Sequence, residues 1–271
     1  MLTILNSISS LNAENALSST QASLQKTLTQ LSTGLRINSG SDDAAGLSIA
    51  NGLAGNIAAL SQSASNASDG IGVLQTADGA LSQVTTLLNR AVTLATEASN
   101  GGLSASQNTA LDTEYQNILT EIDNIGSSTT FNGTAVFSAT ALQTYLTDGN
   151  TSGLSVSATT GALSSTTLAL NTTKLDNATD AQAALTAISA AIGTVASQRG
   201  TIGAAVNQLQ ASQSVANTEV TNLTSAENDI QNADIGQTVA KMTQFNVLQQ
   251  TGMAALQQSN QAQQSVLKLL Q

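Results

Sequence analysis

Residues 53–95 read LAGNIAALSQSASNASDGIGVLQTADGALSQVTTLLNRAVTLA. An apolar residue returns at every seventh position of this stretch, at Leu53, Leu60, Ala67, Leu74, Leu81, Leu88 and Ala95. The same period returns nearer the other end of the chain, at Ile188, Val195, Ile202, Leu209, Ala216, Leu223 and Ile230. A seven-residue repeat sustained over six heptads is typical of helices that pack lengthwise side by side. The two stretches therefore predict long helices that meet in space.

Signals at both ends set the length of the first of these helices. Asp42 and Asp43 stand where carboxylates cap a helix N-terminus, and Asn100, Gly101 and Gly102 form a C-terminal stop. At about 1.5 Å per residue, the helix between them would be roughly 85 Å long. The chain contains no proline, so no residue forces a kink by losing its N–H. We expect a mainly α fold, an elongated rod of long antiparallel helices.

Shorter elements surround these two helices. We expect a terminal helix over residues 4–35, ended by the Gly, Asn and Ser residues that follow it. A second helix carries Leu111, Tyr115, Ile118, Ile122 and Ile125 at helical spacing and is closed by Gly126. Alternating runs at 154–157 and 167–171 predict strands of a small β-hairpin region. The helical pattern resumes near Asp180, breaks weakly at 232–234 and continues to Leu270.

The core of the rod is predicted from the heptad positions. The candidates are the large apolar members of the two repeats: Leu60, Leu74, Leu81, Leu88, Ile188, Val195, Ile202, Leu209, Leu223 and Ile230. Only 2% of the chain is aromatic, so the core must be built from Leu, Ile, Val and Ala.

Composition excludes several classes of function. The chain has no Cys and no His, which removes disulfides, thiolate metal sites and the commonest neutral-pH base. We therefore expect no enzyme, no metal site and no cofactor. The net charge of −10 argues against nucleic acid, since phosphate binding needs clustered Lys and Arg. The sequence has no apolar stretch of about 20 residues, so we expect no membrane span. Residues 1–10 lack the features of a signal peptide.

Charge is nearly absent from the two ends of the chain. Residues 1–41 hold one acid, Glu14, and residues 236–271 hold none. An amphipathic helix with an uncharged polar face suits burial against copies of itself, so we interpret both ends as assembly surfaces. The candidate residues are the apolar positions of the terminal helices: Leu17, Leu24, Leu28, Leu31, Leu35, Ile235, Val239, Met242, Leu248, Leu267 and Leu270. The alternative is that these are weak, frayed helices that fold only when a partner covers them.

Four motifs, in order, carry a resemblance to a known family. They are LSTGLRINSGSDDAAGLSIAN at 31–51, NASDGIGVLQTADGAL at 66–81, Phe131-Asn-Gly133, and IQNADIGQTVAKMTQFNVLQQTGMAALQQSNQAQQSVLKLL at 230–270. Together they closely resemble bacterial flagellin, over roughly residues 1–135 and 180–271. About 50 residues separate the two regions, so the chain is similar to a minimal flagellin without large surface domains.

The resemblance implies an extracellular structural subunit for swimming motility, a homo-oligomer of many copies in a hollow helical filament. It implies unfolded export by the flagellar type III apparatus through residues 2–35, a flagellin chaperone on residues 232–271, and contact with filament cap and hook-associated proteins. In the family's plan, residues 1–41 and 232–271 form the inner terminal coiled coil. Residues 42–177 form the long helix, second helix and hairpin of the outer rod, and residues 178–231 its returning helix.

Many flagellins are sensed by a vertebrate Toll-like receptor, through residues that align with Arg90, Leu94 and Glu114. Thr93 and Glu97 depart from the pattern of strongly sensed flagellins, and the added negative charge would weaken a polar contact. The alternative for Arg90 is a surface ion pair or packing between copies.

Other readings remain open from the sequence. A hook–filament junction protein shares the rod plan and terminal coiled coil, although the first and third motifs favour the filament subunit. A lipid-surface binder would need basic polar faces and bulky aromatics. The Ser- and Thr-rich residues 127–175 could be O-glycosylated or simply suit an exposed hairpin.

Overall fold

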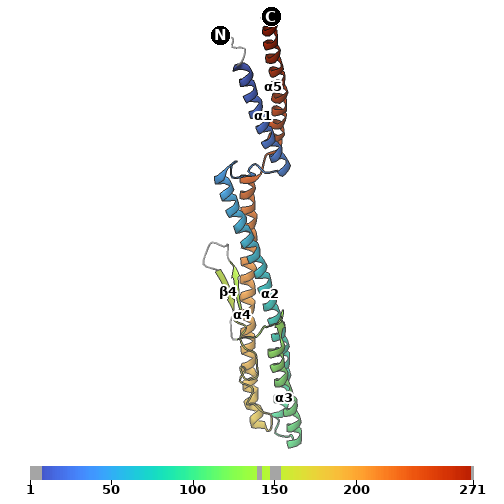
Figure 1. Ribbon diagram of the computed structural model, residues 1–271. Helices are drawn as coiled ribbons and strands as arrows, with labels where there is room; N and C mark the ends of the chain where they lie inside the picture. Colours follow the sequence, from blue (N-terminus) through green and yellow to red (C-terminus); the bar gives the residue numbers. More distant parts are fainter. Residues whose placement is uncertain (1–7, 139–141, 147–153, 270–271) are drawn as a thin grey trace. The chain divides into compact units, whose positions relative to one another are not determined.

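The computed structural model describes residues 8–138, 142–146 and 154–269. Its helices are α1 (Ile8–Thr33), α2 (Ala44–Ala98), α3 (Ala105–Ser128), α4 (Ala178–Gln231) and α5 (Ile235–Leu269). Contacts within the chain define two units, one of residues 1–55 and 222–271 and one of residues 56–221. We call them the terminal unit and the central unit. The prediction of a mainly α chain with a small β region is confirmed (Figure 1).

In the central unit, α2 and α4 pack antiparallel along the heptad positions. The Ala64 carbonyl accepts a hydrogen bond from the Gln213 side chain (3.2 Å), and Asp78 forms an ion pair with Arg199. The partner on α4 therefore comes earlier in the sequence as the residue on α2 comes later, which shows that the helices are antiparallel. The buried heptad residues of this unit are Leu60, Ala67, Leu74, Leu81, Leu88, Ala95, Ile188, Val195, Ile202, Leu209 and Ala216. A second buried series on α2 lies three residues after the first: Ala77, Val84, Ala91 and Ala98. The two series form the apolar seam that a heptad pattern predicts.

The outermost heptad positions are less covered. Leu53, Leu223 and Ile230 are half-buried. All three lie on the parts of α2 and α4 that belong to the terminal unit.

Residues 159–177, which we call the strap, run antiparallel along α3. Asp123 of α3 accepts hydrogen bonds from the backbone N–H and hydroxyl of Ser165 (2.6 and 2.8 Å), and Asp112 accepts one from the Leu175 N–H (2.8 Å). Between these points Tyr115 is fully buried and its hydroxyl bonds that of Thr173. The polar bonds fix the strap while its leucines join the core.

The prediction that Gly126 closes α3 is wrong, because the helix continues to Ser128. The real role of Gly126 is close packing. A Cβ at position 126 would lie 1.9 Å from the carbonyl oxygen of Leu163 in the strap. Only glycine lets these two backbones approach so closely.

Two antiparallel strand pairs complete the central unit. β1 (Thr130–Phe131) pairs with β2 (Thr134–Ala135), and β3 (Leu142–Leu146) pairs with β4 (Leu154–Ala158). The strand predicted at 154–157 is therefore confirmed. The strand predicted at 167–171 is wrong, because these residues form turns. Ala169 takes a φ of 56° there, and the alternation of Leu168 and Leu170 serves burial in a turn instead.

In the terminal unit, α1 and α5 run antiparallel side by side (Figure 1). α1 ends where Gly34 takes a φ of 73°, a common way to terminate a helix. The break predicted at 232–234 is confirmed, and the side-chain carboxylate of Asp234 accepts the Gln237 N–H (3.1 Å) at the start of α5. Residues 4–7 of the predicted first helix, and Leu270, lie outside the described residues. Within the described part of the chain, no helix has the length and apolar character needed to cross a membrane.

Candidate functional site

The pairing of α1 with α5 is the site that the uncharged ends of the sequence indicate. Near its open end the hydroxyls of Ser10 and Ser259 hydrogen-bond (2.7 Å), and seven residues inward a Cβ at Gly252 would contact Leu17. Most of the least exposed residues of the two helices repeat with heptad spacing. On α1 they are Ser10, Ala13, Leu17, Thr20, Leu24, Thr27 and Leu31, and on α5 they are Thr238, Met242, Phe245, Gln249, Gly252, Leu256 and Ser259. We call these residues the terminal seam.

Few members of the terminal seam are fully buried, and those few are polar. Thr27 and Thr238 are buried, and their hydroxyls donate to the carbonyls of Ser23 and Asp234 one turn earlier. The leucines of α1 and Met242 are only half-buried. The seam therefore holds the two helices together with little apolar burial of its own.

A second set of apolar side chains lies beside the seam and is exposed. Leu28, Val239 and Met253 each directly follow a seam residue and are 46%, 40% and 44% exposed. Leu248 directly precedes the seam residue Gln249 and is 45% exposed. Heptad positions adjacent to the seam face outward beside it. We call Leu28, Val239, Leu248 and Met253 the flank residues.

The structure thus distributes the predicted assembly residues over different environments. Leu17, Leu24, Leu31 and Met242 lie in the terminal seam, whereas Leu28, Val239 and Leu248 are flank residues. Ile235 is exposed at the start of α5, Leu35 is half-buried, and Leu267 lies in α5. Sequence reasoning missed Met253, although its position fourteen residues after Val239 is a signal that heptad counting could have used.

A backbone clamp joins the two ends of the terminal unit. Leu35 and Asn232 form an isolated antiparallel bridge, in which the Arg36 N–H donates to the Gln231 carbonyl (2.6 Å) and the Ala233 N–H to the Gly34 carbonyl (2.9 Å). The Arg36 guanidinium also donates to the Ile230 carbonyl (2.8 Å). Residues about 200 positions apart are therefore tied where α1 and α4 end.

The turn before α2 is organised by Asp42. Its carboxylate pairs with Lys26 (2.7 Å) and accepts the N–H groups of Asn38 and Ser39 (both 3.1 Å). The hydrogen bond from Lys26, followed by that from Asn38, lowers the pKa of Asp42 from 3.8 to about 2. Asp43 caps α2, as predicted, by accepting the Gly46 N–H (2.9 Å). Among the described residues, no three acidic side chains cluster as a metal site would require.

The residues aligned with a receptor contact lie in the central unit. Arg90 donates to Glu114 through Nε and Nη2 (2.8 and 2.6 Å), and both side chains are about half exposed. Leu94 is only 1% exposed and belongs to the core. The geometry matches the alternative of a surface ion pair for Arg90, and receptor contact stays a prediction.

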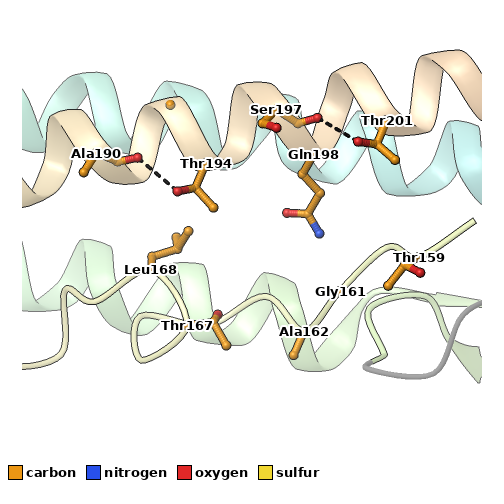
Figure 2. A pocket seen from close by; sticks show the side chains of 11 residues that line it. Thr159, Gly161, Ala162, Thr167, Leu168, Ala190, Thr194, Ser197, Gln198 and Thr201 are labelled. Carbon is orange, nitrogen blue, oxygen red and sulfur yellow. Dashed lines mark hydrogen bonds between the residues drawn. The ribbon is translucent and has the colours of Figure 1, made fainter.

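A groove of about 640 Å³ lies between α4 and the strap. Figure 2 shows Thr194 and Gln198 of α4 directed toward the strap, with Leu168 opposite Thr194 and Thr159 nearer Thr201. The hydroxyls of Thr194 and Thr201 donate to carbonyls of their own helix, Ala190 and Ser197. None of the lining residues is charged or titratable at neutral pH. The groove therefore offers neutral polar contacts and no acid, base or nucleophile.

Comparison with known proteins identifies the relatives of the chain. The bacterial flagellin N-terminal helical region matches residues 4–142, and the bacterial flagellin C-terminal helical region matches residues 185–270. A flagellin of Halalkalibacterium halodurans is 34% identical over 248 residues, which cover 91% of each chain. The phase 1 flagellin of Salmonella naestved is 44% identical over 129 residues, or 48% of this chain and 26% of that protein. The crystal structure of Bacillus cereus flagellin is similar with a TM-score of 0.50 and 27% identity, over 60% of this chain and 94% of that one.

Proposed function

This chain belongs to the bacterial flagellin family, and from that membership we propose that it is exported unfolded by the flagellar type III apparatus and builds a filament used for swimming. The family consists of structural proteins that polymerise in many copies into the flagellar filament, outside the cell, and not of enzymes. Both family regions and the relative that covers nearly the whole chain favour the filament subunit over a hook–filament junction protein.

The exposed flank residues are the observation that supports self-assembly through the chain ends. Leu28, Val239, Leu248 and Met253 leave large apolar side chains in water on helices with almost no charge. Covering such side chains with a second copy removes apolar surface from water. We assign the flank residues to contacts between copies and the terminal seam to contacts within one copy.

Export and chaperone binding would use the same segments before assembly. The terminal unit has few fully buried apolar side chains, chiefly Ile37 and Ala50. Such a unit costs little free energy to unfold, which suits passage through an export channel. An amphipathic α5 with two lysines, no acidic residue and exposed apolar side chains also needs cover before assembly. Filament cap and hook-associated proteins would then meet the same terminal helices at the two ends of the polymer.

Seeded polymerisation tests the assembly proposal. Purified chain is heated to monomer, cooled with short seeds and imaged by negative-stain electron microscopy, beside a sample that lacks residues 1–35 and 236–271. Long uniform filaments are expected from the full chain alone. A full chain that stays monomeric under seeding would favour the junction protein, and filaments from the truncated chain would refute assembly through the ends.

Two charged variants separate the roles of seam and flank. Leu31→Asp places a carboxylate in the terminal seam and should stop polymerisation by parting α1 from α5. Val239→Asp should stop polymerisation while leaving that pairing intact, because its site is exposed in the monomer. Val239→Thr is the matched control, since it keeps the side-chain shape without the charge. Normal filaments from Val239→Asp would show that this flank position is not buried between copies.

Recognition by a Toll-like receptor would have to use the exposed part of the aligned residues. Arg90 and Glu114 are accessible as an ion pair, whereas Leu94 is in the core. A receptor reporter assay with purified monomer tests this. Silence at concentrations where a known flagellin activates the receptor would remove it as a partner.

A further inference from the structure

Three Asn-Gly pairs occur in the sequence, at Asn51-Gly52, Asn100-Gly101 and Asn132-Gly133. In such a pair the backbone nitrogen of the glycine can attack the side-chain carbonyl carbon of the asparagine. The missing Cβ removes the steric obstacle that other residues present to this ring closure. Whether a given pair reacts then depends on how its backbone is held.

Asn100-Gly101 lies in the turn between α2 and α3, where the Asn100 N–H donates to the Glu97 carbonyl (3.1 Å) and the Asn100 carbonyl accepts the Leu103 N–H (3.3 Å). Asn100, Gly101 and Gly102 are all exposed. The amide N–H of Gly101 donates no hydrogen bond to any residue that the structure describes. The Asn100 side-chain oxygen accepts the Gly102 N–H (3.4 Å), an Asx-turn arrangement that folds the carboxamide back over its own following backbone.

The other two pairs are held by hydrogen-bonded secondary structure. Asn51 and Gly52 lie inside α2, where the amide of Gly52 belongs to the helical ladder. Asn132 and Gly133 form the two-residue turn of the β1–β2 hairpin, with φ values of 50° and 78°. Ring closure at Asn51 would have to break helical hydrogen bonds first. At Asn132 it would have to change the left-handed turn conformation that the strand pairing on either side holds.

We propose that Asn100 is a site of spontaneous deamidation in the folded protein. The Gly101 nitrogen loses its proton and forms a bond to the Asn100 side-chain carbon, and ammonia leaves with the former amide nitrogen. Water then opens the resulting five-membered imide at one of its two carbonyls. The products are aspartate or isoaspartate, and the only co-reactant is water.

The modification places a new negative charge where the fold disfavours one. Position 100 lies two residues after the C-terminal end of α2, where the helix dipole repels anions. Glu97 already places one negative charge in the last turn of this helix, three residues earlier, and the modification would add a second. Isoaspartate would in addition lengthen the backbone of a short turn. The product therefore differs from the original chain in both charge and stability.

Mass spectrometry of incubated protein tests the assignment. Folded full-length chain is kept in neutral buffer below its unfolding temperature, and a second sample is kept in denaturant. Digestion after glutamate releases residues 98–114, because Glu97 and Glu114 bound that peptide. Asn51 and Asn132 fall in other peptides of the same digest, so the three pairs are compared within one sample. Fragment spectra separate Asn100 from Asn108 within the peptide.

The expected result is conversion of Asn100 at least several-fold faster than Asn51 and Asn132 in the folded sample, with the difference lost in denaturant. Gly101→Ala is the matched variant, because an added Cβ at position 101 meets no atom within 4 Å yet hinders attack by the nitrogen. It should slow conversion of Asn100 several-fold. Equal rates at the three pairs in the folded protein, an unreactive Asn100, or an unchanged rate in Gly101→Ala would each overturn the proposal.

Discussion

Gly126→Ala should destabilise the central unit, although alanine is the better helix former. The position lies within α3, where replacing glycine by alanine gains about 0.5–1 kcal/mol from backbone entropy. Against this gain, the new Cβ would stand 1.9 Å from the Leu163 carbonyl oxygen and 2.9 Å from its carbon. Neither atom belongs to a flexible side chain, so the strap itself must move away.

The size of the effect follows from what that movement disturbs. Overpacking a core costs about 1–3 kcal/mol, and sometimes more. The strap residue Ser165 makes two hydrogen bonds to Asp123, and bonds to a charged group contribute about 1.5–3 kcal/mol each. Weakening them in part brings the net loss to about 2–4 kcal/mol. In a unit of this size that corresponds to a fall in melting temperature of roughly 5–15 °C.

Gly79→Ala is the control that isolates the clash. Gly79 lies inside α2, and a Cβ there would meet no atom within 4 Å. The same substitution should therefore raise the melting temperature by about 2–4 °C per kcal/mol gained. Both variants are compared with the original chain as monomers by calorimetry, with circular dichroism to confirm helix content. A Gly126→Ala protein at least as stable as the original would refute the close packing of strap and α3.

Three further outcomes are expected. Asp42→Asn should lower the unfolding midpoint at neutral pH. The difference in midpoint from the original chain should shrink as the pH falls from 3.8 toward about 2 and vanish below, because a carboxyl group with a lowered pKa stabilises the fold only while it is charged. Unfolding curves across that pH range measure this difference. Thr173→Val should cost about 1–3 kcal/mol in urea unfolding by leaving the buried Tyr115 hydroxyl unpaired, more than the roughly 1 kcal/mol of Tyr115→Phe. Arg199→Met should change stability by about 1 kcal/mol or less, because the side chains of its pair with Asp78 are still 37% and 43% exposed. A larger loss measured by calorimetry would contradict this.

The helices of the central unit could be predicted because one pattern determines both their period and their burial. Leu74, Leu81 and Leu88 recur with the period that places them on one face, and all three are fully buried. No proline or competing charge pattern interrupts them. Local preference and long-range packing therefore agree along these helices, which is the condition under which sequence patterns are reliable.

The strap could not be predicted, because its conformation depends on contacts that its own sequence does not reveal. Leu168 and Leu170 alternate with polar residues as a strand would, but hydrogen bonds from α3 hold the segment in turns instead. Asp112 and Asp123 supply those bonds from about 50 positions away. Gly126 was likewise predicted to end a helix, because the sequence does not show that the Leu163 backbone packs against this position in the folded chain.

The terminal seam was predicted in part for a related reason. The leucines of α1 marked the helix, but spacing among apolar residues alone placed Leu28 with Leu24 and Leu31. In the structure the heptad runs through Thr27 instead, and Leu28 is turned outward. A seam that uses threonine, serine and glycine carries too weak an apolar signal to fix its own register.

The contrast between the two units gives the uncharged ends a physical meaning. Apart from Ile37, the large apolar side chains that are fully buried in the described residues, from Leu74 to Leu209, lie in the central unit. The terminal unit instead combines a half-buried seam, a two-bond backbone clamp and apolar flank residues left in water. Because apolar burial is the main source of folding free energy, we expect the central unit to be the more stable of the two in the monomer. If the flank residues contact other copies, as we propose, the terminal unit gains further stability on assembly. On that proposal, the ends of the subunit are its least stable part as a monomer and are stabilised by the polymer, so assembly is coupled to their final folding.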